Sequence, residues 1–240
     1  MQSLKLKVQE LPYEINEELK LLRTNIQFCG DDKRVLLITS AFSGEGKSTI
    51  ALDLARSFTE LGKKVLFIDA DMRKSVLLHS ASQTDTLGLS HYLSGQCKGN
   101  DIFCRTNIKN LFVVHSGKVP PNPAELLAKP QMESLIEVGR EFCDYVIIDC
   151  PPVGMVVDAS VLAPYCDGVL VLIESGEVKY RLAREVIEKL EATKCPILGV
   201  ILNKVNIHKS GAYYGRYYGR YYGRYYGRYK GYYKDEEASS

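Results

Sequence analysis

Residues 34–61 combine three features in the order that places a phosphate-binding loop at the edge of a sheet. The run Arg-Val-Leu-Leu-Ile-Thr-Ser at 34–40 has the length and composition of a buried strand, and residues 47–61 have helical spacing. Between them, Ala-Phe-Ser-Gly-Glu-Gly-Lys-Ser at 41–48 fits GxxxxGK[ST] except that Ala41 replaces the first glycine. We therefore expect an α/β fold of the P-loop type, with an ordinary Gly-rich connection as the alternative.

The residue types in this loop suit the phosphates of a nucleotide bound with Mg²⁺. Gly44 and Gly46 allow the backbone N–H groups to approach phosphate oxygens, and Lys47 brings a positive charge to the β- and γ-phosphates. Ser48 is placed to bind Mg²⁺, and Thr49 to reach the α-phosphate. The predicted nucleotide contacts are Gly44, Glu45, Gly46, Lys47, Ser48, Thr49 and Asn203.

Asn203 is predicted to contact the purine base of the nucleotide. Asn-Lys-Val-Asn at 203–206 follows the last apolar run, and Asn206 lacks the carboxylate that would accept hydrogen bonds from guanine. The amide of Asn203 suits the edge of adenine, with a strand-end cap as the alternative. We therefore expect the nucleotide to be ATP.

Short apolar or β-branched runs recur along the chain, with helical patterns between most of them. This alternation is typical of a parallel sheet with helices on both faces. Before the first run, Ile15, Leu19, Leu22 and Ile26 form the apolar stripe of an amphipathic helix, and its other, charged face is expected to include Arg23. We expect an N-terminal helical segment at 1–30, a P-loop domain at 31–208 and a tail at 209–240. The runs are 34–39, 64–68, 111–115, 144–149, 168–173 and 198–202.

Acidic residues end two of the apolar runs. Asp149 follows Val-Ile-Ile and has the position of a Walker B carboxylate, while Asp69 and Asp71 follow Val-Leu-Phe-Ile. The ligand crevice of an open parallel sheet lies at the carboxyl ends of its strands, so these side chains and the loop are expected to meet. A turn or helix cap is the alternative for Asp69 and Asp71. The predicted catalytic residues are Lys47, Asp69, Asp71 and Asp149, and the predicted Mg²⁺ ligands are Ser48, Asp69, Asp71 and Asp149.

Composition excludes several other classes of protein. The formal net charge of +2 is too small to indicate nucleic-acid binding by the whole chain. No apolar run approaches the roughly 18–20 residues that span a bilayer, so we expect a cytoplasmic protein. The cysteines number seven, at scattered spacings without a CxxC pair, which predicts reduced thiols.

The C-terminal segment differs from the rest of the chain. Eleven of the 16 tyrosines lie in residues 213–233, in four Tyr-Tyr-Gly-Arg repeats and a related end, without Leu, Ile, Val, Phe or Met. Residues 209–240 carry seven basic and three acidic side chains, a net charge of +4. Glycine at every fourth position disfavours a helix, so a flexible tail is expected. Its tyrosines are Tyr213, Tyr214, Tyr217, Tyr218, Tyr221, Tyr222, Tyr225, Tyr226, Tyr229, Tyr232 and Tyr233.

Together these motifs resemble the bacterial tyrosine kinase (BY-kinase) family of capsule and exopolysaccharide systems, over essentially the whole chain. The loop at 41–48, the Asp-x-Asp-x-Arg of 69–73 and the run ending in Asp149 are similar to that family's Walker A, A′ and B motifs. Residues 120–127 resemble its proline-containing loop. Glu17, Lys20 and Arg23 are similar to its Glu-x-x-Arg-x-x-Arg oligomerisation helix, with Lys20 in place of an arginine that pairs in a bidentate manner.

The resemblance implies an ATP- and Mg²⁺-dependent kinase with Asp69 as base and with Asp71 and Asp149 at the metal. The tail tyrosines would be its own phosphate acceptors, served in trans within a homo-oligomeric ring. Implied partners are a transmembrane activator of the polysaccharide co-polymerase kind, which would recruit the chain to the inner face of the membrane, and a cognate tyrosine phosphatase. The activity would regulate capsular or exopolysaccharide synthesis.

The sequence allows two other functions. A partitioning or division-site ATPase of the MinD/ParA kind carries a lysine five residues before the phosphate lysine, where this chain has Phe42. Alternatively, the Tyr- and Arg-rich tail would bind single-stranded nucleic acid by stacking and charge. No nucleic-acid partner is expected under the kinase interpretation.

Overall fold

The computed structural model describes residues 2–7, 10–75, 77 and 87–205. The tail tyrosines therefore lie outside the described residues. One compact unit runs from Met1 to Asn203 and includes the N-terminal segment that we set apart as residues 1–30. Within the described part of the chain, all seven cysteines are free thiols, as their number and spacing predict.

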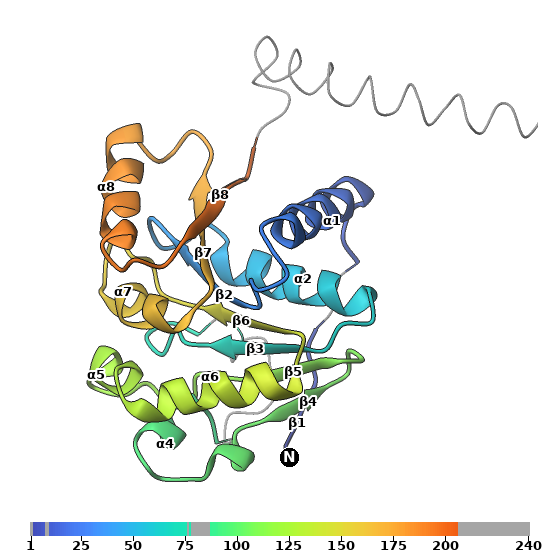
Figure 1. The fold of residues 1–240 in the computed structure, drawn as a ribbon, viewed down its shortest axis with the longest axis vertical. Coiled ribbons are helices and arrows are strands. Elements are labelled where there is room, and N and C mark those ends of the chain that lie inside the picture. The colour runs from blue at the N-terminus through green and yellow to red at the C-terminus, as the bar shows by residue number, and fades with distance from the viewer. Residues whose placement is uncertain (1, 8–9, 76, 78–86, 206–240) are drawn as a thin grey trace, which may run out of the picture. The chain divides into compact units, whose positions relative to one another are not determined.

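A single eight-stranded sheet forms the centre of this unit (Figure 1). Its order is β1-β4-β5-β3-β6-β2-β7-β8, and neighbours are parallel except for β4 and β5. The six predicted runs all become strands. The bounds are β1 Gln2–Leu4, β2 Val35–Ser40, β3 Val65–Asp69, β4 Cys104–Thr106, β5 Leu111–Val114, β6 Tyr145–Asp149, β7 Gly168–Glu174 and β8 Ile197–Asn203.

Helices cover both faces of the sheet, as expected (Figure 1). Residues of α1 and α2 pack on one face around Leu54 and Phe58, and residues of α4 to α8 pack on the other around Leu135 and Ile136. The bounds are α1 Tyr13–Phe28, α2 Lys47–Glu60, α4 Leu89–Leu93, α5 Pro123–Leu127, α6 Pro130–Phe142, α7 Asp158–Leu162 and α8 Tyr180–Glu191, with single 3₁₀ turns at Gly99–Asp101 and Ala163–Tyr165.

Two strands were not predicted. Residues 2–4 and 104–106 are three residues each, too short to show a period, and they pair with each other at one edge of the sheet. The side chain of Leu4 is nevertheless fully buried in the core beneath α1 and α2. The N-terminal segment thus contributes to the sheet as well as forming a helix.

The first helix corrects the expected orientation of two residues. Ile15, assigned to the apolar stripe, is 45% exposed, while Arg23, assigned to the charged face, is buried. The guanidinium of Arg23 donates to the backbone oxygen and to Oγ of Ser57 in α2. Arg23 therefore joins α1 to α2 within one chain, because it lies at the crossing of the two helices. Lys20 instead forms an ion pair with Glu17 at 2.7 Å on the partly exposed side.

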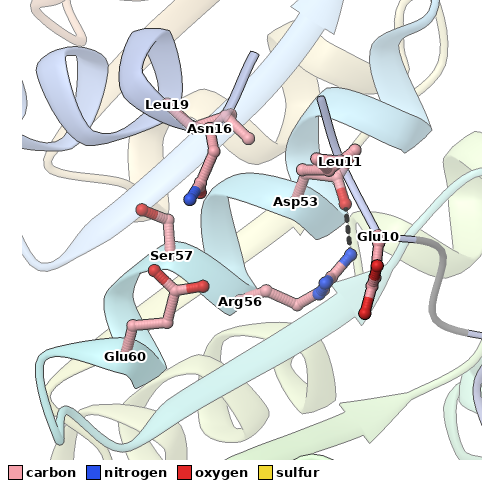
Figure 2. Close-up of a pocket in the computed structure, with 8 residues that line it drawn as sticks. All are labelled: Glu10, Leu11, Asn16, Leu19, Asp53, Arg56, Ser57 and Glu60. Atoms are coloured by element: carbon pink, nitrogen blue, oxygen red, sulfur yellow. Dashed lines mark hydrogen bonds and ion pairs between the residues drawn. The ribbon is translucent and has the colours of Figure 1, made fainter. Parts of the chain in front are cut away.

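A pocket of about 290 Å³ lies along the same α1–α2 contact (Figure 2). Asp53 pairs with Arg56 at 2.9 Å in its wall. The lining residues are Glu10, Leu11, Asn16, Leu19, Asp53, Arg56, Ser57 and Glu60. The lining thus includes three carboxylates and one guanidinium, a balance of charge that is unsuited to the phosphates of a nucleotide.

Gly139 offers a test of how closely α6 packs on the sheet. A Cβ at this position would lie 2.8 Å from Cγ2 of Val146 and 2.9 Å from Cδ2 of Leu66. We expect Gly139→Ala to lower the free energy of unfolding by about 1–3 kcal/mol in urea titrations, although alanine favours helices. Glu141→Ala, at an exposed position of the same helix, should change it by less than about 0.5 kcal/mol. Equal stability of the two variants would contradict the close packing.

Candidate active site

The carboxyl ends of three neighbouring strands form the site. Strand β6 lies between β3 and β2, and Asp69 at the end of β3 is directly paired in register with Asp149 at the end of β6. The loop at 41–48 follows β2 and leads into α2 at Lys47. The topology therefore brings the loop and both acidic strand ends together, as expected for an open parallel sheet.

The phosphate loop has the backbone conformation that its glycines allow. Gly46 caps α2 with φ +92°, and Gly44 has φ +91°, in the left-handed region that other residues rarely occupy. A Cβ on Gly46 would also lie 2.5 Å from Nδ2 of Asn203. Ser48 and the exposed Thr49 stand in the first turn of α2. The free N–H groups of a helix start favour an anion at this place.

Glu45 has a role within the loop that the sequence did not reveal. Its side chain is buried, and its carboxylate accepts hydrogen bonds from the N–H of Phe42 at 2.7 Å and of Glu174 at 3.0 Å. The first bond closes the loop on itself, and the second ties it to the end of β7. The carboxylate of Glu45 is thus used to shape the loop, and a nucleotide contact through its side chain stays a prediction.

Asn203 lies at the end of β8, beside the loop. Its Nδ2 donates to the backbone oxygen of Glu45 at 2.7 Å. This bond resembles the strand-end role that we gave as the alternative. Contact between Asn203 and adenine stays a prediction.

Lys47 is buried among the acidic residues. Its Nζ lies 2.5 Å from Oδ1 of Asp149, 3.8 Å from Oδ2 of Asp71 and 3.2 Å from Oγ of Ser48. Burial acts to lower the pKa of Lys47, but the charge of Asp149 and its hydrogen bond outweigh burial, so the pKa is raised. Lys47 therefore remains a cation in a site with little water.

Asp69 and Asp149 are both almost fully buried. Burial raises the pKa of Asp69 to about 7, and the negative charge of Asp149 acts in the same direction. Burial also raises the pKa of Asp149, although its ion pair with Lys47 and hydrogen bonds from Lys47 and Ser48 oppose the change. A carboxyl group with a pKa near neutrality can accept and release a proton at physiological pH.

Asp71 does not continue the strand. Its Oδ1 accepts hydrogen bonds from the N–H of Arg73 at 3.3 Å and of Lys74 at 2.9 Å, which makes a turn after β3. Its Oδ2 still faces Lys47. Asp71 therefore has both expected roles. Its Oδ1 caps the turn that we gave as the alternative, and its Oδ2 belongs to the site.

Arg73 forms a two-bond ion pair with Asp158 at the start of α7, from Nε to Oδ2 at 3.0 Å and from Nη2 to Oδ1 at 3.1 Å. Asp158 is fully buried. Sequence reasoning missed this partner, because Asp158 lies 85 residues away and belongs to no motif.

The donor set fits Mg²⁺ in its chemistry, since Ser48 and the three aspartates supply the oxygens that this ion prefers. Among the described residues, however, no group of three or more His, Cys, Asp or Glu side chains is arranged to hold a metal. The ammonium group of Lys47 lies between the carboxylates of Asp149 and Asp71, where a metal ion would have to bind. The assignment of individual metal ligands therefore stays a prediction.

The pKa of Asp69 predicts a pH dependence of stability. The folded chain holds a proton on Asp69 up to about pH 7, whereas the unfolded chain releases it near pH 3.8. Stability from this group is therefore complete below pH 3.8 and is lost as the pH rises through 7. We expect Asp69→Asn to remove about 3 kcal/mol of this decline between pH 4 and 7.5 in urea titrations. Glu60→Gln, at an exposed site, should leave the decline intact. Parallel profiles for Asp69→Asn and the parent chain would contradict the raised pKa.

Comparison with known proteins agrees with this geometry. Residues 33–195 match the AAA domain family. The tyrosine-protein kinase CpsD of Streptococcus agalactiae is 46% identical over 200 residues, which are 83% of this chain and 86% of CpsD. The succinoglycan biosynthesis transport protein ExoP of Rhizobium meliloti is 36% identical over 187 residues, which are 77% of this chain but 24% of ExoP.

Among solved structures, a tyrosine kinase domain is more similar to this chain than a MinD protein is. The kinase domain of the Escherichia coli tyrosine kinase ETK superposes with a TM-score of 0.78 at 30% identity, covering 86% of this chain and 85% of that domain. The septum site-determining protein MinD of Pyrococcus horikoshii, in complex with Mg-ADP, reaches 0.60 at 25% identity over 70% and 69% of the two chains. Within the described residues, no helix of this chain has the length and hydrophobicity that crossing a membrane requires. The chain belongs to the bacterial tyrosine kinase family.

Proposed function

We propose that this kinase transfers the γ-phosphate of ATP to tyrosines of its own C-terminal segment, in trans within a homo-oligomer. The observation that carries the proposal is the buried Lys47 beside Asp149 and Asp71, at the strand end next to Asp69. A cation in a phosphate loop and a carboxyl group with a pKa of about 7 suit phosphoryl transfer to a hydroxyl.

In the proposed mechanism, Lys47 leaves its contacts with Asp149 and Asp71 and binds the phosphates of ATP. The negative charge of the phosphates replaces the carboxylates as its partner, so Lys47 is never left unpaired in a buried site. Asp69 accepts the proton of the attacking tyrosine hydroxyl. Mg²⁺, held by Ser48 and the carboxylates that Lys47 releases, would neutralise charge on the phosphates.

The composition of residues 209–240 supports their role as acceptor. The segment has a net charge of +4, and each phosphate adds about −1.5 to −2, so two or three phosphates roughly cancel the charge and further ones reverse it. Tails that carry several phosphates would repel one another. Phosphorylation would thus loosen an assembly in which tails are shared.

The comparison with ExoP supports a membrane partner. This chain corresponds to about a quarter of that transport protein, so in ExoP the similar region is joined to other sequence. We propose that a separate transmembrane activator supplies the corresponding part here, and recruits the chain to the inner face of the membrane. A cognate tyrosine phosphatase would reset the tail, and the cycle would regulate capsular or exopolysaccharide synthesis.

Labelled ATP tests the activity and the acceptor together. With Mg²⁺ present, we expect the full chain to gain label on tyrosine, and expect Lys47→Met to lose at least about 100-fold of the rate because the phosphates lose their cation. A chain ending at Gly211, or one with all tail tyrosines replaced by phenylalanine, should bind ATP but remain unlabelled. Label on the phenylalanine variant would refute the tail as acceptor.

A mixing experiment tests transfer in trans. The Lys47→Met chain has an acceptor tail but no active site, and the chain ending at Gly211 has the reverse. Neither should be labelled alone, whereas the mixture should place label on the Lys47→Met chain. The rate should rise with the concentration of the truncated chain. An unlabelled mixture, beside an active full-length control, would show that each site serves only its own tail.

A further inference from the structure

Asp69 already binds a hydroxyl group in this structure. Oγ of Ser75 donates to Oδ2 of Asp69 at 2.5 Å, while the N–H of Asp71 donates to Oδ1 at 3.2 Å. Asp69 is 1% exposed, whereas Ser75 is only partly buried. Each carboxylate oxygen of Asp69 thus has a donor, and the donor on Oδ2 is a hydroxyl, the group that an acceptor tyrosine would present.

The turn that precedes Ser75 helps to hold it in this position. Asp71 caps the turn at Arg73 and Lys74, which sends the chain back towards the end of β3. Arg73 anchors the turn to the buried carboxylate of Asp158 in α7. The turn is thus held by Asp158 through Arg73 as well as by the hydrogen bond from Asp71 to Asp69, so the position of Ser75 does not depend on its own hydrogen bond alone.

We propose that Ser75 is a positioning residue that sets the specificity of the site for tyrosine over water. Its hydroxyl occupies Oδ2 of Asp69 until a tyrosine hydroxyl replaces it. This inference rests on the proposed role of Asp69 as the base. Nothing in the motifs of the sequence distinguishes Ser75, which lies six residues after Asp69.

Water and tyrosine would use Asp69 in the same way. In transfer to tyrosine, the phenolic oxygen forms a bond to the γ-phosphorus, the bond from this phosphorus to the β,γ-bridging oxygen breaks, ADP leaves with the electron pair, and the proton goes to Oδ2 of Asp69. In hydrolysis a water oxygen takes the place of the phenolic oxygen, and inorganic phosphate forms. A water bound at Oδ2 of Asp69 therefore leads to hydrolysis of ATP without phosphorylation of tyrosine.

The acidity of the competing hydroxyl groups explains why Ser75 would exclude water from Oδ2 of Asp69 but not tyrosine. Phenol has a pKa near 10 and water one near 15.7, so tyrosine is the stronger hydrogen-bond donor to a carboxylate. The hydroxyl of Ser75 competes with water as a group already in place, without loss of translational freedom. A tyrosine held at the site can displace it, whereas a water gains little by doing so.

The test compares two products of the same labelled ATP, phosphotyrosine and inorganic phosphate, at saturating ATP with Mg²⁺. In Ser75→Ala we expect the ratio of phosphotyrosine to phosphate to fall about tenfold, with KM for ATP unchanged. Ser75→Thr keeps the hydroxyl and should retain the ratio within about twofold. Ser134→Ala removes an exposed serine hydroxyl, which donates to the backbone oxygen of Pro130 in α6, and should also retain the ratio within about twofold. An unchanged ratio in folded Ser75→Ala would overturn the inference.

A second background separates this inference from the proposed function. In the chain with all tail tyrosines changed to phenylalanine, Ser75→Ala should raise phosphate release about tenfold, because only water remains as acceptor. If thermal melting shows that Ser75→Ala is unfolded, Ser75→Cys, with a weaker donor of similar size, should give a smaller rise of the same sign. No rise in either folded variant would overturn the role of Ser75. Absence of phosphotyrosine in the unsubstituted chain would instead overturn the proposed function.

Discussion

The buried ion pair between Lys47 and Asp149 is the contact on which the site depends. Both groups are more than nine-tenths buried, and their nitrogen and oxygen lie 2.5 Å apart. Removing either partner would leave a buried charge without compensation, which costs several kcal/mol in proteins. The phosphate loop and the end of β6 must therefore stay together, and strand pairing of β6 with β2 and β3 sets where the other groups lie.

The same burial gives the acidic residues different tasks. Asp149 is paired with Lys47, while Asp69, one strand away, has no cation within an ion-pair distance among the described residues. Its pKa is raised to about 7 by burial and by the neighbouring charge. Asp71 uses one oxygen for the turn and the other for Lys47. Three carboxylates that look alike in sequence are thus separated by their surroundings into the counterion of Lys47, a carboxyl group with a raised pKa and a turn cap.

Much of the fold follows from local sequence, and the part that does not has a physical explanation. The six apolar runs became strands, and five of them are buried on both faces as a covered parallel sheet requires, whereas β8 at the edge of the sheet is partly exposed. β1 and β4 are three residues each and depend on each other, so no local pattern could reveal them. The charge of Arg23 favours the surface, but Arg23 lies four residues after Leu19 and three before Ile26, on the buried side of α1, where its guanidinium donates to Ser57 of α2. The residue that accepts these hydrogen bonds belongs to another helix, so the sequence of α1 alone cannot identify it.

For the site, the sequence by itself determined the phosphate loop, its lysine and the acidic strand ends, because their chemistry requires those residue types next to strand ends in any parallel sheet. It also determined the composition of the tyrosine segment. Only the tertiary structure decided that Glu45 closes the loop, that Arg73 pairs with Asp158, and that Ser75 bonds Asp69. These contacts join residues across turns and between elements, where the partner is chosen by the path of the chain and by burial. Side chains of the same types at other positions would satisfy the sequence pattern equally well without making those bonds.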